Sequence, residues 1–155
     1  ASDVVLIPAQ VLRQINLELI RTQTGKHATM FYGVIDTEDN TLDYASAAHF
    51  PAPVLCTREV CRAIEPESLA VGLFDDAMFE NRRQKLDGFE RLSVVSDGFL
   101  ELLADVSLQE KEAHLLELGA DPTHTMQHVL TQMTSEGKTR SASDDITVLT
   151  VERVK

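Results

Sequence analysis

The sequence has only two cysteines, Cys56 and Cys61, which lie five positions apart. There is no second pair and no Cys-x-x-Cys spacing, so neither a disulfide framework nor a zinc site is indicated. We therefore expect two reduced thiols, which agrees with a cytoplasmic location. The chain also lacks an apolar run of the roughly 18–20 residues that a membrane helix needs. Its N-terminus lacks the basic region and cleavage site of a signal peptide, so no membrane partner is expected.

Basic residues are scarce as well. Asp and Glu number 25 against 14 Lys and Arg, which gives a formal net charge of −11. The longest basic cluster, Arg82 and Arg83 with Lys85, is short and flanked by acidic residues. Nucleic-acid-binding proteins normally carry a basic stripe, so no nucleic acid is expected as a partner. An acidic protein that handles an anionic substrate usually does so with bound divalent cations, although acidic surfaces also serve solubility.

The length and composition predict one folded domain over residues 1–155. The chain is 43% hydrophobic and 25% charged, as is usual for globular domains. A chain of this size can form one core and has little room for a second. The sequence does not begin with methionine. We therefore expect it to be a processed or incomplete piece of a longer protein.

The pattern of apolar residues predicts an α+β fold. An amphipathic helix is expected from Pro8 to about Thr22, because apolar residues recur there at helical spacing. Two strand-like runs, 28–35 and 41–47, flank the turn-forming segment 36–40 and predict a β-hairpin. Further strands are expected at 54–56, 79–86, 91–96 and 146–151.

Two more helices are expected between the last two strands. Ser107 and Glu110 have the spacing of a capping box, which predicts a helix that begins there. Asp121 and Pro122 predict the start of the second helix, since Asp can cap and Pro suits a first turn. Residues 136–143 are expected to form a polar loop.

Two acidic residues stand out by their position. Asp97, followed by Gly98, comes directly after the apolar run of a predicted core strand, and Asp144 comes directly before the last strand. Carboxylates at the ends of neighbouring strands can converge on a Mg²⁺ or Mn²⁺ ion, which activates a water molecule. The alternative is that Asp-Gly is a common turn dipeptide and that Asp before a strand is common in loops.

Six segments also carry a family resemblance. Residues 94–102 end a strand in Ser-Asp-Gly followed by a hydrophobic residue and Glu, and residues 143–149 contain Asp-Asp-hydrophobic-Thr. The other four are 8–16, 30–36, 44–53 and 69–74. Taken in their order along the chain, the six segments resemble those of SpoIIE-type serine/threonine phosphatases of the PPM family, which are similar to protein phosphatase 2C. The resemblance covers nearly the whole chain.

The resemblance implies a four-layer α-β-β-α sandwich of two antiparallel sheets flanked by helices, with the N-terminal strands missing. It implies hydrolysis of phosphoserine or phosphothreonine with two Mn²⁺ or Mg²⁺ ions. Asp97 and Asp144 match two metal-ligating, catalytic carboxylates of the family. Gly98 matches the glycine that lets the backbone turn sharply beside the site. Asp145 matches a neighbouring position that is usually not a ligand.

The chain departs from the family in one important respect. The early strand Asp and the Asp-Gly-x-Gly-His-Gly motif, which supply further metal contacts in the family, are absent. We expect them upstream of residue 1 in the native protein. Alternatively, the protein is a degenerate pseudophosphatase that binds a partner protein as an adaptor. Ala48 also replaces the glycine that the family has before His49.

The resemblance further implies a regulatory setting. Such domains are often output modules of bacterial response regulators, with phosphorylated anti-sigma-factor antagonists as substrates or sigma factors as partners. A linker upstream could make the native protein a homodimer.

Other candidate residues are weaker. His49 is interpreted as structural, and the spacing of His124 and His128 lacks a zinc signature. Ser96 lies in no Gly-x-Ser-x-Gly elbow, so it is not expected to be a nucleophile.

Overall fold

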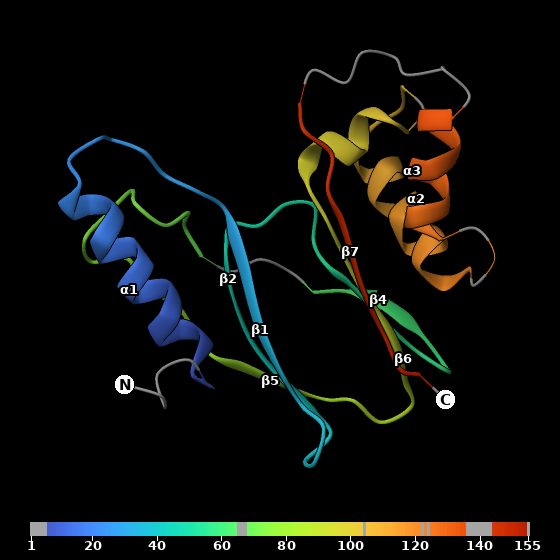
Figure 1. Cartoon of the computed structure of the whole chain (residues 1–155), viewed down its shortest axis with the longest axis horizontal. Helices are drawn as coiled ribbons and strands as arrows, with labels where there is room; N and C mark the ends of the chain where they lie inside the picture. The colour runs from blue at the N-terminus through green and yellow to red at the C-terminus, as the bar shows by residue number, and fades with distance from the viewer. Residues whose placement is uncertain are drawn as a thin grey trace. The chain divides into compact units, whose positions relative to one another are not determined.

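The computed structural model describes residues 6–64, 68–103, 105–121, 123, 125–135 and 144–154. The chain divides into two compact units, each with a sheet of its own (Figure 1). Unit 1 comprises Ala1–His49 and Pro66–Asp87, and unit 2 comprises Phe50–Glu65 and Gly88–Lys155. The expectation of one domain over residues 1–155 stays a prediction.

Unit 1 consists of helix α1 (Pro8–Arg21) and a three-stranded antiparallel sheet. The sheet has the order β1 (Met30–Asp36), β2 (Thr41–Ala47), β5 (Arg82–Lys85). The predicted hairpin is confirmed: Asp36 Oδ1 accepts from the backbone N–H groups of Glu38 and Asp39 at 2.8 and 2.9 Å. Helix α1 packs on the sheet through a small buried core, which consists of Leu12, Ala45, Ala47 and Val71.

Unit 2 contains a four-stranded antiparallel sheet and two α-helices. The strand order is β4 (Cys61–Ala63), β3 (Val54–Thr57), β6 (Phe89–Val95), β7 (Val148–Glu152). A short 3₁₀ helix, η2 (Asp97–Glu101), follows β6, and α2 (Leu108–Ala120) and α3 (Met126–Ser135) come before β7. Helix α2 approaches the sheet closely, because a Cβ atom at Gly119 would lie only 2.6 Å from Val54 Cγ1.

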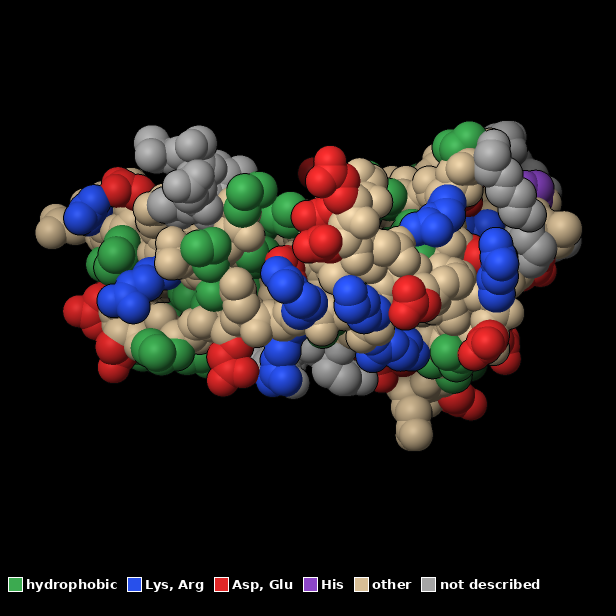
Figure 2. All heavy atoms as spheres, turned by 90° about the horizontal axis from the view of Figure 1, so that it is seen from below, with side chains coloured by type: hydrophobic (Ala, Val, Ile, Leu, Met, Phe, Trp, Pro, Cys, Tyr) green, Lys and Arg blue, Asp and Glu red, His purple; other side chains and the backbone are tan. Residues whose placement is uncertain are grey.

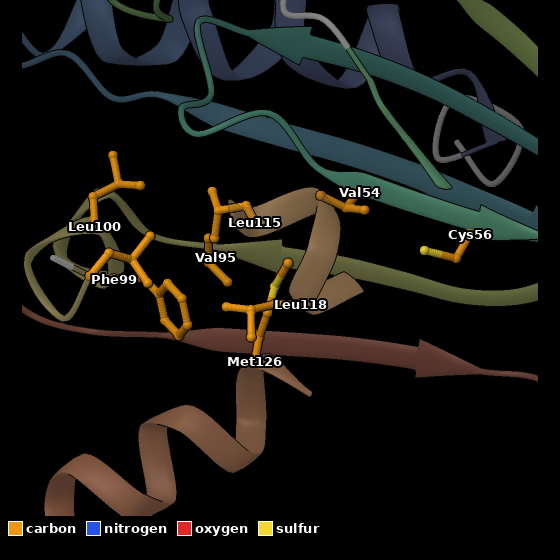
Figure 3. Packing of buried hydrophobic residues seen from close by; sticks show 9 residues of the cluster. Val54, Cys56, Val95, Phe99, Leu100, Leu115, Leu118 and Met126 are labelled. Atoms are coloured by element: carbon orange, nitrogen blue, oxygen red, sulfur yellow. The ribbon is translucent and has the colours of Figure 1, made fainter. Parts of the chain in front are cut away.

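The core of unit 2 lies between its sheet and its helices. Leu115, Leu118 and Met126 pack against strand residues and against Phe99, whose exposed fraction is 0% (Figure 3). Together with unit 1, this arrangement confirms an α+β fold with two antiparallel sheets flanked by helices. The predicted capping box is confirmed too: Ser107 N donates to Glu110 Oε2 at 2.9 Å, and Glu110 N donates to Ser107 Oγ at 3.3 Å.

Two expectations were wrong. Cys56 and Cys61 are not reduced thiols but form a disulfide, because they lie directly opposite each other on β3 and β4. Helix α3 begins at Met126 rather than at Asp121, which instead caps the C-terminus of α2. Thr125 Oγ1 accepts from His128 N at 3.3 Å at the true start of α3. The expected polar loop 136–143 and His124 lie outside the described residues.

One face of the protein is mixed in charge. On the face shown in Figure 2, the described Lys and Arg side chains lie among Asp and Glu side chains. Within the described part of the chain, no helix is long and apolar enough to cross a membrane.

Candidate metal site

Asp97 lies where the chain leaves β6. Strand β6 ends at Val95, and Phe99 N then donates to the Ser96 carbonyl at 3.0 Å as η2 begins. The buried ring of Phe99 fixes this short helix on the core of unit 2. Asp97, at the first position of η2, is exposed. The sequence thus places a solvated carboxylate on backbone that is held by a strand on one side and by a core aromatic residue on the other.

Asp144 lies where the chain enters β7, and it is also exposed. Strand β7 runs beside β6 (Figure 1). The two strands are antiparallel, and Val148 lies opposite Val95. In an antiparallel pair, the end of one strand and the start of the next meet at the same edge of the sheet. The structure therefore brings the segments of Asp97 and Asp144 together, as a shared site requires.

Gly98 makes this approach possible. A Cβ atom at residue 98 would lie 2.6 Å from the Asp145 carbonyl oxygen and 3.3 Å from that of Asp144. Gly98 is not among the glycines with positive φ, so a left-handed backbone is not the reason for glycine here. Close packing between two backbone segments accounts for glycine at this position.

The two carboxylates have the same local hydrogen bonding. Asp97 Oδ1 accepts from Gly98 N at 3.0 Å, and Asp144 Oδ1 accepts from Asp145 N at 2.8 Å. Among the described residues, neither carboxylate forms an ion pair with Lys, Arg or His. Both carboxylates therefore face solvent and are open to a cation.

Ser96 contributes to the site in a way that the sequence did not indicate. Its hydroxyl donates to the Asp145 carbonyl at 3.0 Å and accepts from Thr147 N at 2.8 Å. The sequence does show a serine directly before Asp97, but the contacts that its hydroxyl makes depend on the register of β6 and β7. His49 belongs to unit 1, where its ring lies near Phe31, with centroids 6.4 Å apart.

The donor set fits part of a divalent-cation shell. Carboxylate oxygens suit hard cations such as Mg²⁺ and Mn²⁺, and the contact at Gly98 holds the two Asp-bearing segments at fixed positions. The described residues contain no group of three or more His, Cys, Asp and Glu that could hold a metal ion. Asp97 and Asp144 thus offer two carboxylates of the kind that such a cation takes.

Comparison with solved structures supports the fold. The SiaA-PP2C domain of Pseudomonas aeruginosa has a TM-score of 0.73 and 16% identity, with 96% of this chain and 61% of that one covered. For the RsbU and RsbW domains of Rv1364c from Mycobacterium tuberculosis, the TM-score is 0.70 with 24% identity, and the match covers 94% of this chain and 41% of that one. For the phosphatase domain of SpoIIE from Bacillus subtilis, the TM-score is 0.56 with 17% identity, and the match covers 81% of this chain and 56% of that one.

Sequence comparison identifies the family. Protein IcfG of Synechocystis is 32% identical over 71 residues, which are 46% of this chain and 11% of that protein. The chain thus spans about a tenth of this relative and less than two thirds of the three structures. The family described as Stage II sporulation protein E (SpoIIE) matches residues 2–154. A match over nearly the whole chain means that this protein belongs to the SpoIIE family.

Proposed function

We propose that this chain is part of a metal-dependent phosphatase domain that hydrolyses phosphoserine or phosphothreonine in proteins. The observation that carries the proposal is the packing of Gly98 against Asp144 and Asp145, which joins two acidic strand ends at one sheet edge. Membership in the SpoIIE family supports the phosphatase class. The net charge of −11 agrees with a need for cations when a phosphorylated protein is bound.

The proposed roles of the residues follow from their positions. Asp97 and Asp144 each present a carboxylate to a divalent cation, Mn²⁺ or Mg²⁺, and Gly98 keeps their segments in contact. A site for two ions would need ligands in addition to these two carboxylates. When bound, such ions polarise a phosphoryl group and lower the pKa of water so that it can attack phosphorus.

The proposed setting is bacterial signalling. Family membership and the likeness to the RsbU and RsbW domains and to SiaA-PP2C support a regulatory domain that acts in sigma-factor control. The proposed substrate is a phosphorylated protein of the anti-sigma-factor antagonist type. A response-regulator output module, and a homodimer formed through an upstream linker, belong to the same proposal.

A second candidate function is that of a pseudophosphatase adaptor, which would bind a sigma factor or an antagonist without catalysis. It is favoured by the finding that the described residues contain no group of three or more His, Cys, Asp and Glu that could hold a metal ion. The presence of both carboxylates favours the enzyme, because a docking surface has no need of the pair.

The deciding experiment is a Mn²⁺ titration by calorimetry, together with an assay of a phosphoserine peptide. It uses an upstream-extended form of this chain (the longer protein), as wild type and as the Asp97→Asn and Asp144→Asn variants. Asp145→Asn is the matched control, since it removes a neighbouring charge at a position that is not a proposed ligand. We expect metal binding and activity to depend on Asp97 and Asp144 but not on Asp145. If the wild-type protein binds no Mn²⁺ and releases no phosphate, the phosphatase proposal is contradicted and the adaptor role is favoured.

A further inference from the structure

The Ser96 hydroxyl joins the two segments that carry the candidate metal ligands. Its Oγ donates to the Asp145 carbonyl at 3.0 Å and accepts from Thr147 N at 2.8 Å. The backbone N–H of Ser96 adds a third bond, to the Thr147 carbonyl at 3.0 Å. Three hydrogen bonds thus link the residue before Asp97 to the stretch directly after Asp144.

The hydroxyl replaces a backbone group that has turned away. Val95 and Val148 form the last regular pair of β6 and β7. A hydrogen-bonded antiparallel pair exchanges two N–H···O bonds. Ser96 N makes one of these bonds with Thr147, but the Ser96 carbonyl accepts from Phe99 N at 3.0 Å as η2 begins. The amide of Thr147 therefore donates to the Ser96 hydroxyl, which extends the pairing by one residue.

The same hydroxyl is not used to cap its own helix. Ser96 occupies the N-cap position of η2, where a serine side chain commonly accepts from an N–H group of that helix. It makes no such bond here. Its two side-chain bonds go to the neighbouring chain segment, which Gly98 also contacts. The backbone at Asp145 is thus held by Ser96 through hydrogen bonding and by Gly98 through close packing.

We propose that Ser96 is a positioning residue that fixes the main chain at Asp145 and so sets where the Asp144 carboxylate lies relative to Asp97. This inference rests on the proposed metal-dependent function, which gives the two carboxylates a common task. Hydrogen bonds that orient metal ligands typically contribute about 10- to 100-fold to metal affinity. Ser96→Ala removes both side-chain bonds and keeps the backbone bond to Thr147, whereas Ser96→Thr keeps a hydroxyl.

The test compares wild type with Ser96→Ala, Ser96→Thr and the control Thr147→Ala, which keeps both backbone groups of residue 147. Amide hydrogen exchange of the metal-free chain measures directly how well the Ser96 hydroxyl protects the backbone N–H of Thr147. In Ser96→Ala we expect the amide of Thr147 to exchange roughly tenfold faster, because it loses its acceptor. Mn²⁺ titration of the longer protein should show affinity that is about 10- to 100-fold weaker in Ser96→Ala. Ser96→Thr should restore both values, and Thr147→Ala should leave the Mn²⁺ affinity unchanged.

The outcomes separate this inference from the proposed function. If Ser96→Ala shows the same exchange of the Thr147 amide and the same Mn²⁺ affinity as wild type, the positioning role is overturned while the metal site stands. Faster exchange with unchanged Mn²⁺ affinity would overturn it as well, since the hydroxyl would then serve stability alone. A wild-type protein without Mn²⁺ binding would overturn the proposed function, and the positioning role with it.

Discussion

Arg83 and Asp43 lie directly opposite each other on β5 and β2, where the guanidinium binds the carboxylate at two points. Nε donates to Oδ1 and Nη2 donates to Oδ2, each at 2.6 Å. These hydrogen bonds hold the pKa of the Asp43 carboxyl below its ordinary value and raise the pKa of Arg83. The pair connects the short strand β5 to the hairpin of unit 1, so it should support the edge of that sheet.

The sign of the resulting pH dependence follows from the lowered pKa of Asp43. The pair stabilises the fold above the ordinary pKa of the carboxyl group, and this contribution is lost as the pH falls through the lowered value. Arg83→Gln should therefore lower Tm by about 1–3 °C at neutral pH, as expected for a pair whose Arg side chain is largely exposed. The difference should vanish in acid below the lowered pKa.

The check is thermal unfolding followed by circular dichroism across the acidic range. Lys85→Gln, on the same strand, is the matched control, because the described structure gives Lys85 no ion pair. A constant Tm difference between Arg83→Gln and wild type at every pH would contradict the assignment.

Asn16 is a fully buried polar residue of α1, with an exposed fraction of 0%. Its amide Nδ2 donates to the Phe74 carbonyl at 2.9 Å, and its Oδ1 accepts from Gly72 N at 2.7 Å. Asn16→Ala leaves both backbone groups without these partners, so we expect a loss of about 1–3 kcal/mol in the free energy of unfolding.

Denaturant unfolding measures this change in stability. Gln14→Ala serves as the control, since Gln14 is exposed and lies two positions earlier on the same helix. We expect its effect to be within about 0.5 kcal/mol. Equal losses in both variants would contradict this prediction, because substitution by Ala raises helix propensity at both positions and the loss would then not come from the buried hydrogen bonds.

Local signals in the sequence predicted much of this fold. The turn at Asp36 and the capping box at Ser107 are set by side chains that bond within three residues, so neighbouring sequence was sufficient. The start of α3 was mispredicted because Asp121 uses its carboxylate locally in another way. It accepts from the backbone N and the hydroxyl of Thr123, both at 2.7 Å, outside any helix start.

Features that depend on strand register could not be predicted. Strand β4 has only three residues and is defined by its pairing with β3. The disulfide exists because that pairing sets Cys56 opposite Cys61. At the candidate site, Asp97 and Asp144 were identified by their positions at strand ends, whereas the role of Ser96 needs the register of β6 and β7.

The disulfide predicts a redox dependence of stability. Closing so short a loop stabilises a fold by about 2 kcal/mol in the chain-entropy description. Reduction with dithiothreitol should therefore lower the Tm of the wild-type chain. The Cys56→Ser/Cys61→Ser double variant should start from the lower Tm and show no response to reductant. Mass spectrometry after alkylation of the unreduced, denatured chain should find neither cysteine labelled. Full labelling would contradict the disulfide.

Gly98→Ala tests whether the contact between the two acidic segments is needed for metal binding. The added Cβ would meet the Asp145 carbonyl oxygen at 2.6 Å, and because the neighbour is backbone, the segment itself must move. We expect a loss of about 1–3 kcal/mol in the free energy of unfolding. We also expect Mn²⁺ binding by the longer protein to weaken about tenfold or more, since displacement of Asp144 alters the ligand geometry.

Gly119→Ala is the matched control for this substitution. Its added Cβ would also approach a neighbour to 2.6 Å, but that neighbour is Val54 Cγ1 in the core of unit 2. It should lower stability by a similar amount and leave Mn²⁺ affinity unchanged. If the two variants weakened Mn²⁺ binding equally, the effect at Gly98 would be one of general stability. A selective loss in Gly98→Ala would instead show that the close approach at Asp145 serves the metal site, because only that variant separates the two segments.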